Sequence, residues 1–97
     1  MIKVYDKAQW HIDAGENKDI VILKLEEVFS FLEDKELLTD EGKEIVEMGI
    51  DSSVSIHERM LTSEGNNFLD KYYDEVINLG PGEILEGLKE KYMEFKQ

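Results

Sequence analysis

Apolar residues recur at helical spacing in the first half of this 97-residue chain. Five of them, at positions i, i+4, i+7, i+8 and i+11, form a single stripe: Val21, Leu25, Val28, Phe29 and Leu32. Such a stripe is typical of an amphipathic helix. The letters IVILKL at 20–25 would also suit a buried strand, but the pattern continues too far for one. The sequence therefore predicts a helix over 18–36, which Asn17 can cap.

The pattern indicates three further helices downstream. A short helix is predicted at about 40–48, because glycine commonly ends a helix and Gly49 follows. A longer helix carries pairs of apolar residues every four positions as far as Leu79, and Gly80 ends it. A last helix is predicted at about 82–95. Its apolar face consists of Ile84, Leu85, Leu88, Tyr92 and Phe95.

Two of these helices begin with nearly the same six residues. The letters LLTDEG stand at 37–42, and MLTSEG stands at 60–65. In each copy a threonine, Thr39 or Thr62, precedes polar and acidic residues. A threonine hydroxyl can accept a hydrogen bond from a free N–H of the first helical turn, and acidic groups in that turn suit the helix dipole. We therefore interpret the repeat as the same helix-start sequence used twice.

The N-terminus favours β-structure. Residues 2–5 (IKVY) are rich in strand-forming side chains and predict a short strand. Trp10 and Ile12 alternate with polar residues, so the strand could continue through them until Gly15 ends it.

The segment 50–61 fits two predictions. Ser55 and Glu58 match the capping box S-x-x-E, which predicts a short helix over 56–61. Apolar residues alternate with serine at 53–56, which instead predicts a strand that pairs with the N-terminal strand. We favour the helix slightly and keep the strand as the alternative.

These elements predict one mainly helical domain over 1–97. Its class is mainly α (α+β): a compact bundle of about four helices with a short N-terminal β element. The length suits a single domain, and no linker or low-complexity segment divides the chain.

Charge is the least ordinary feature of the composition. The chain has 23 Asp and Glu residues against 11 Lys and Arg residues, which gives a formal net charge of −12. Such a field repels nucleic acid and anionic lipid, so we expect neither as a partner. It attracts basic proteins and speeds their encounter. Solubility alone would also account for it.

The absence of cysteine excludes disulfides, thiolate metal sites and a cysteine nucleophile. It fits a reducing compartment, and the first residues show no apolar signal region, so we expect a cytoplasmic protein. The longest uninterrupted apolar run, residues 20–23, is far too short to cross a membrane.

The repeat also raises the question of DNA binding. The spelling L-T-x-E-G-x-x-x-[LV] resembles the stretch after the wing in winged-helix transcription regulators, over about ten residues. Those regulators need basic residues on the DNA-binding surface. Here residues 26–51 hold ten acidic groups and only two basic ones, Lys35 and Lys43. We therefore expect no DNA binding through this surface.

A metal or catalytic site has weak support. His11 and Asp13 would share one face of a strand, and His57-Glu58 could add ligands. No zinc-protease pattern, nucleophile elbow or phosphate-binding loop is present. We expect a protein that is not an enzyme and has no cofactor. A small metal-dependent enzyme using His11 and Asp13 is the least favoured alternative.

The acidic band at 26–51 is the strongest candidate site. Small size, lack of cysteine and dense acidic charge resemble, at class level, the bacterial immunity and antitoxin-like inhibitors. That resemblance implies a protein that covers a basic partner such as a nuclease toxin. The expected partner-binding residues are Glu33, Asp34, Glu36, Asp40, Glu41, Glu44, Glu47 and Trp10. The alternative is a regulator or structural subunit that forms homo-oligomers and has no basic partner.

Overall fold

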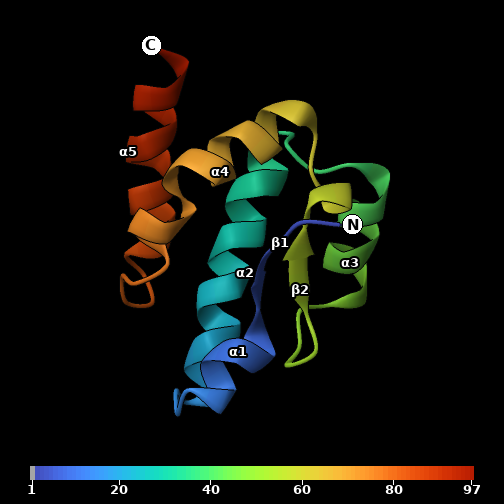
Figure 1. The fold of residues 1–97 in the computed structure, drawn as a ribbon, viewed down its shortest axis with the longest axis vertical. Helices are drawn as coiled ribbons and strands as arrows, with labels where there is room; N and C mark the ends of the chain where they lie inside the picture. The colour runs from blue at the N-terminus through green and yellow to red at the C-terminus, as the bar shows by residue number, and fades with distance from the viewer. Residues whose placement is uncertain (1) are drawn as a thin grey trace.

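The computed structural model describes residues 2–97, which form five α-helices, a 3-10 helix and a two-stranded sheet. In chain order the elements are β1 (Val4–Lys7), α1 (Ala8–Asp13), α2 (Lys18–Asp34), α3 (Asp40–Met48), β2 (Ser55–His57), the 3-10 helix η1 (Glu58–Met60), α4 (Ser63–Val76) and α5 (Ile84–Lys96). Helix α2 runs through the middle of the molecule, with α5 on one side and the sheet and α3 on the other (Figure 1). The predicted mainly helical fold with a small N-terminal β element is confirmed.

The predicted helix starts are confirmed in atomic detail. The Asn17 side chain accepts hydrogen bonds from the backbone N–H groups of Asp19 and Ile20 at the start of α2. Thr39 accepts from the N–H of Gly42 at 3.4 Å, and Thr62 accepts from that of Gly65 at 3.1 Å. Each threonine thus caps one helix, α3 or α4, as the repeat predicts.

The two copies of the repeat also pair with each other, which the sequence did not indicate. Leu38 and Leu61 form an isolated antiparallel bridge. The N–H of Thr39 donates to the carbonyl of Met60 at 2.9 Å, and the N–H of Thr62 donates to the carbonyl of Leu37 at 2.8 Å. The same backbone hydrogen bond, from the threonine N–H to the carbonyl of the first residue of the other copy, therefore forms in both directions. These two bonds fix the starts of α3 and α4 beside each other.

The segment 50–61 contains a strand, and the favoured helix over 56–61 is wrong. In the antiparallel sheet Ile56 lies opposite Asp6 and Ser55 opposite Lys7. Ile56 is fully buried, so pairing with β1 both satisfies its backbone and removes its side chain from water. The capping box does not form either, because Glu58 accepts from the N–H of Lys3. Only the short turn η1 is helical.

The predicted continuation of the first strand through Trp10 and Ile12 is also wrong. After Lys7 the chain turns into α1, and the N–H of the fully buried Ala8 donates to the carbonyl of Val54 at 3.0 Å. Ile12 packs against the core, whereas Trp10 is 52% exposed. The alternation of polar and apolar residues here was too short to distinguish a strand from two turns of helix.

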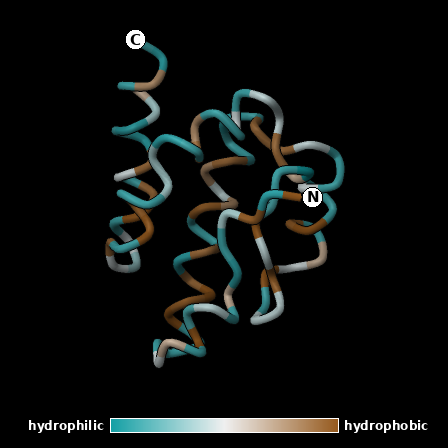
Figure 2. Tube along the Cα trace, in the orientation of Figure 1, coloured by the Kyte–Doolittle hydropathy of each residue, from teal (hydrophilic) through white to brown (hydrophobic). Residues whose placement is uncertain are grey.

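The core lies between α2, α4 and α5, and apolar segments recur along α2 (Figure 2). At its centre Phe31, Phe68 and Tyr92 pack with ring centroids 5.3–5.6 Å apart, in tilted and edge-to-face geometry. Such pairs add to the free energy gained by burial alone. Among residues 2–97, no helix combines the length and the apolar character needed to cross a bilayer.

Candidate protein-binding surface

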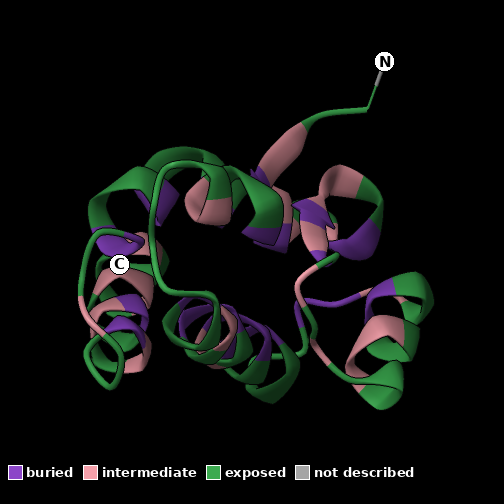
Figure 3. Ribbon diagram, turned by 90° about the horizontal axis from the view of Figure 1, so that it is seen from below, coloured by how far each residue is buried: buried purple, intermediate pink, exposed green. Residues whose placement is uncertain are grey.

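Helix α3 lies at the edge of the molecule and buries little of itself. Gly42 is the only buried residue of Asp40–Met48, while Ile45 and Val46 are half-buried and Met48 is 82% exposed. Figure 3 accordingly shows this helix mostly in the colours of exposed and intermediate residues. The helix is held mainly by η1 and by the paired repeats. Its apolar side is therefore only partly used by the fold.

The seven predicted partner-binding carboxylates are all exposed. Asp40, Glu44 and Glu47 follow one another at i, i+4 and i+7, so they form a stripe along one side of α3. Glu41 is turned about 100° away from Asp40. The other three lie in the last turn of α2 and in the turn that follows it: Glu33, Asp34 and Glu36. We call these seven residues the acidic surface.

Few of these carboxylates are neutralised within the described part of the chain. The ion pairs that reach the acidic surface join Asp34 to Lys35 at 3.6 Å and Glu41 to His57 at 3.5 Å. Both pairs are long and partly exposed, so each contributes little free energy. Most of the negative charge on the acidic surface therefore faces solvent.

Glu36, one of the seven acidic residues, has an unusual backbone conformation. Its φ of 57° makes it a left-handed residue that is not glycine. Its N–H donates to the carbonyl of Glu33, and the N–H of Leu37 donates to that of Leu32, which together form a Schellman ending for α2. Glycine is the usual residue at this position because it avoids the steric cost of the left-handed conformation. In this chain a glutamate occupies the position.

An apolar groove separates α2 from the end of α3. Its lining residues are Glu26, Phe29, Ser30, Glu33, Val46, Gly49 and Ile50, and its volume is about 200 Å³. The floor is apolar, with half-buried Val46 and Ile50 on one side and buried Phe29 on the other. Glu26 and Glu33, both exposed, are its acidic lining residues. We call this depression the α2/α3 groove.

A second groove lies on the other side of α3, against β2. It has a volume of about 160 Å³ and is lined by Ile45, Met48, Gly49, Asp51, Ser53, Val54, Ser55, His57 and Met60. Helix α3 therefore lies between two depressions whose linings combine apolar with polar and charged residues. Protein interfaces likewise combine an apolar centre with polar groups around it.

Two acidic residues of the 26–51 band differ in role. Glu26 is exposed and borders the α2/α3 groove. Glu27, expected on a solvated helix face, instead accepts from the N–H groups of Gly82 at 2.6 Å and Leu85 at 3.0 Å. It caps the start of α5 from a neighbouring helix. No local sequence pattern indicates this contact, because the two segments are more than fifty residues apart.

Trp10 is separated from part of the acidic surface. It lies on α1, which packs against the first turns of α2, whereas Glu33 and Asp34 lie in the last turn of the same helix. Its ring is 5.8 Å from the ammonium group of Lys7, a cation–π contact. The structure therefore gives Trp10 no direct contact with the end of α2.

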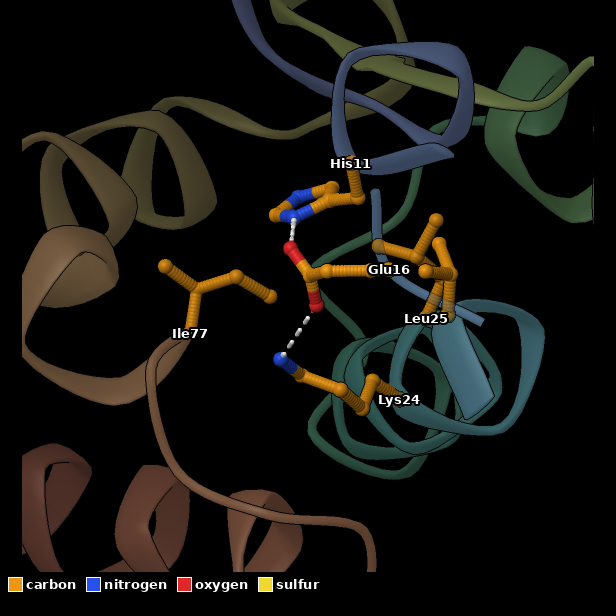
Figure 4. A pocket seen from close by; sticks show the side chains of 6 residues that line it. His11, Glu16, Lys24, Leu25 and Ile77 are labelled. Atoms are coloured by element: carbon orange, nitrogen blue, oxygen red, sulfur yellow. Dashed lines mark hydrogen bonds and ion pairs between the residues drawn. The ribbon is translucent and has the colours of Figure 1, made fainter. Parts of the chain in front are cut away.

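A chain of polar side chains, missed by the sequence analysis, connects α1 to its neighbours. The Asp6 side chain, buried on β1, accepts from the Tyr73 hydroxyl at 2.5 Å and from the N–H of Lys7. His11 places Nε2 2.7 Å from Asp6 and Nδ1 2.8 Å from Glu16. Lys24 on α2 lies 3.5 Å from Glu16 (Figure 4). These five residues have no common spacing that would have revealed them.

The surroundings of the His11 imidazole favour its protonated form. Burial acts to lower its pKa, but hydrogen bonds with Asp6 and Glu16 outweigh burial and raise the pKa above its usual 6.5. The bond with His11 in turn lowers the pKa of Glu16. Burial, followed by the charge of Asp6, raises the pKa of Tyr73 well above the usual range, so its hydroxyl stays a donor.

This geometry does not suit metal binding by His11. Both ring nitrogens lie within hydrogen-bond distance of carboxylates, so neither is free to bind a metal ion. The predicted H-x-D face is also wrong, because α1 is a helix and Asp13 accepts from the Gln9 side chain. Within residues 2–97 no three His, Asp or Glu side chains are grouped as metal ligands. The depression beside His11 admits no water-sized sphere.

Comparison of the chain with protein-family models, with curated proteins and with solved structures found no match. The function of this chain is therefore inferred from the geometry of the molecule.

Proposed function

We propose that this chain is a non-enzymatic, acidic protein-binding module that acts in the cytoplasm and binds a basic protein. The acidic surface and the α2/α3 groove form the proposed binding site. In the inhibitor version of this proposal, the module covers the nucleic-acid-binding groove of a basic partner such as a nuclease toxin, as its class-level resemblance to immunity and antitoxin-like proteins suggests.

The observation that carries the proposal is the combination of exposed carboxylates with apolar grooves around α3. Charge alone would be explained by solubility. Here, however, Val46 and Ile50 leave apolar area open between Glu26 and Glu33. A partner could insert an apolar side chain there while its basic residues meet the rim. Charge at a rim steers encounter, whereas the buried apolar anchor supplies most of the affinity.

The strained position of Glu36 supports the same surface. Left-handed residues other than glycine cost about 1–2 kcal/mol and cluster at functional sites. The fold needs only a helix ending at this position, which glycine would provide more easily. Keeping a carboxylate here is consistent with a role for its charge.

Reversal of three charges tests the proposal. We expect the variant Glu33→Lys, Glu44→Lys, Glu47→Lys to lose roughly tenfold or more in affinity for the natural partner and to show a weaker dependence of affinity on salt. Glu33 and Glu47 lie in the last turns of their helices, where lysine suits the helix dipole, so the fold should tolerate the change. The partner is first captured from a lysate on immobilised wild-type protein, and calorimetry then gives the affinities.

A matched control reverses three exposed charges elsewhere: Asp74→Lys, Glu90→Lys and Glu94→Lys. This control changes the net charge equally but leaves α3 intact, so it should keep most of the affinity. Equal losses in the two variants would show that only net charge matters. Unchanged affinity in the α3 variant would overturn the proposed site.

Self-association is a second candidate, because apolar side chains are exposed away from α3. Ile20 and Leu23 on α2 are 42% and 52% exposed, and Leu23 borders an open depression with Pro81 and Leu85. Light scattering of the purified chain measures its mass directly. A stable dimer that Leu23→Glu converts to a monomer, without any co-purifying basic protein, would favour this candidate over the acidic module.

A further inference from the structure

His11 is the point at which four elements meet through polar groups. It lies on α1 and contacts Asp6 on β1 and Glu16 in the turn before α2. Through Asp6 it is connected to Tyr73 on α4, and through Glu16 to Lys24 on α2. Figure 4 shows the side of this arrangement formed by His11, Glu16 and Lys24.

We propose that His11 is a proton-dependent latch that holds α1 and the following turn against β1, α2 and α4 when its ring is protonated, and that loosens them when the ring is neutral. The latch involves none of the seven carboxylates of the acidic surface. It therefore stands independently of the proposed function.

Hydrogen-bond counting shows why one proton decides the state of the latch. A protonated imidazole has two N–H donors, and each lies 2.7–2.8 Å from a carboxylate. A neutral imidazole keeps only one N–H. Its other nitrogen would then direct a lone pair at Asp6 or Glu16 across the same short distance, so one of the two contacts must open.

The two carboxylates differ in how firmly they are held. Asp6 also accepts from Tyr73 and from the N–H of Lys7, and its side chain is only 6% exposed. Glu16 has a 39% exposed side chain, whose other ion pair is the 3.5 Å contact with Lys24; its backbone N–H also donates to the carbonyl of His11 at 3.0 Å. The bond to Glu16 is therefore the one that opens, and the turn 14–17 is the segment that it releases.

Charge balance leads to the same conclusion. The ionisable groups that face His11, directly or through one neighbour, are Asp6 from β1, Glu16 from the turn, Lys24 from α2 and Tyr73 from α4. With His11 protonated, two positive and two negative charges balance. Loss of the proton leaves a net negative charge in a partly buried group, where repulsion is screened less than at the surface.

The direction of the pH effect follows from linkage. Because the pKa of His11 is raised in the folded state, its contribution to stability is complete below the unfolded value of 6.5 and is lost as the pH rises through the folded value. Because the pKa of Glu16 is lowered, its contribution is complete above 4.5 and is lost as the pH falls. The latch is therefore firmest between these two values and loosens as the pH rises through the folded-state pKa of His11.

Hydrogen exchange of the full-length chain, measured by NMR between about pH 5.5 and 8.5, tests the latch across the range where histidine titrates. After correction for intrinsic exchange rates, protection of amides in α1 and in the turn 14–17 should fall as His11 loses its proton. The expected fall is roughly tenfold for each unit by which the pKa of His11 exceeds 6.5. Amides in the middle of α4 serve as an internal reference.

Two variants make the test decisive. His11→Gln cannot titrate in this range, so its α1 protection should not change with pH, whereas His57→Gln should behave like wild type. Glu16→Gln should lower the pH midpoint of His11, which ¹⁵N shifts of the ring report even if His11→Gln fails to fold. Two results would overturn the latch. One is a wild-type protein whose α1 amides keep the same exchange protection at every pH. The other is a Glu16→Gln variant in which the pH midpoint of His11 is unchanged.

Discussion

Gly42 and Gly65 occupy the positions where the fold leaves least room for a side chain. A Cβ on Gly42 would lie 2.4 Å from the carbonyl oxygen of Met60, and one on Gly65 would lie 2.9 Å from that of Leu37. These carbonyls belong to the opposite copy of the repeat and accept the bonds that join the copies. The glycines are therefore explained by the close approach of two backbones, which the spelling of each copy alone did not reveal.

Gly42→Ala should lower the free energy of unfolding by about 2 kcal/mol, because the obstructing atom is backbone and overpacking costs more than alanine gains in helix propensity. Gly87→Ala is the control. There the Cβ would meet the end of the half-exposed Leu79 side chain, which can move. Urea denaturation should show little change or a small gain for the control. If Gly42→Ala and Gly87→Ala changed the free energy of unfolding equally, the close approach of the two backbones would not explain the glycine at position 42.

Individual helices in this protein depend on caps from different sources. Caps from the residue next to the helix begin α2, α3 and α4. Helix α5 begins differently, since Glu83 gives it no side-chain cap. The carboxylate of Glu27 on α2 accepts from the N–H of Leu85 in its first turn and from that of Gly82 just before the helix. The start of α5 is therefore coupled to the position of α2.

Glu27→Ala should destabilise the protein by about 1–2 kcal/mol, because it removes a charged cap and leaves two N–H groups without a partner. Glu26→Ala, one residue earlier and exposed, changes helix propensity equally without removing a cap. Urea denaturation compares the two. Hydrogen-exchange protection of amides at the start of α5 should fall in Glu27→Ala but not in Glu26→Ala. A similar fall in both variants would show that Glu27 does not cap α5.

At the scale of the whole molecule, charge opposes the compact state. The net charge is −12, and most of the acidic surface has no cation beside it in the described part of the chain. Repulsion among such groups destabilises folding and is reduced by salt.

The melting temperature should therefore rise by a few degrees between about 20 mM and about 500 mM NaCl, because the Debye length becomes shorter than the spacing between surface charges. The variant Glu33→Gln, Glu44→Gln, Glu47→Gln should melt higher at low salt and gain less from added salt. Scanning calorimetry of both proteins at fixed pH measures this. A melting temperature that falls or stays constant with salt would show that ion pairs outweigh repulsion.

Local patterns predicted much of the fold because their causes lie within a few residues. The apolar stripe of α2, the caps at Asn17, Thr39 and Thr62, and the end of α3 at Gly49 all depend on neighbours in sequence. The carboxylates of the acidic surface were likewise expected to be exposed. The segment 55–57 is a strand although its local capping signal favours a helix, because its strand partner lies about fifty residues away.

The sequence by itself determined that α2, α3, α4 and α5 are helical, where the first three of them begin, and how much negative charge the surface carries, since propensity, capping and charge are properties of short segments. Tertiary structure alone decided that the two repeats pair with each other, that Glu27 caps α5, and that His11 lies between Asp6 and Glu16. Each of these contacts joins groups whose spacing in sequence follows no period. Only the packing of the core, by fixing where distant segments meet, brings them within hydrogen-bonding distance.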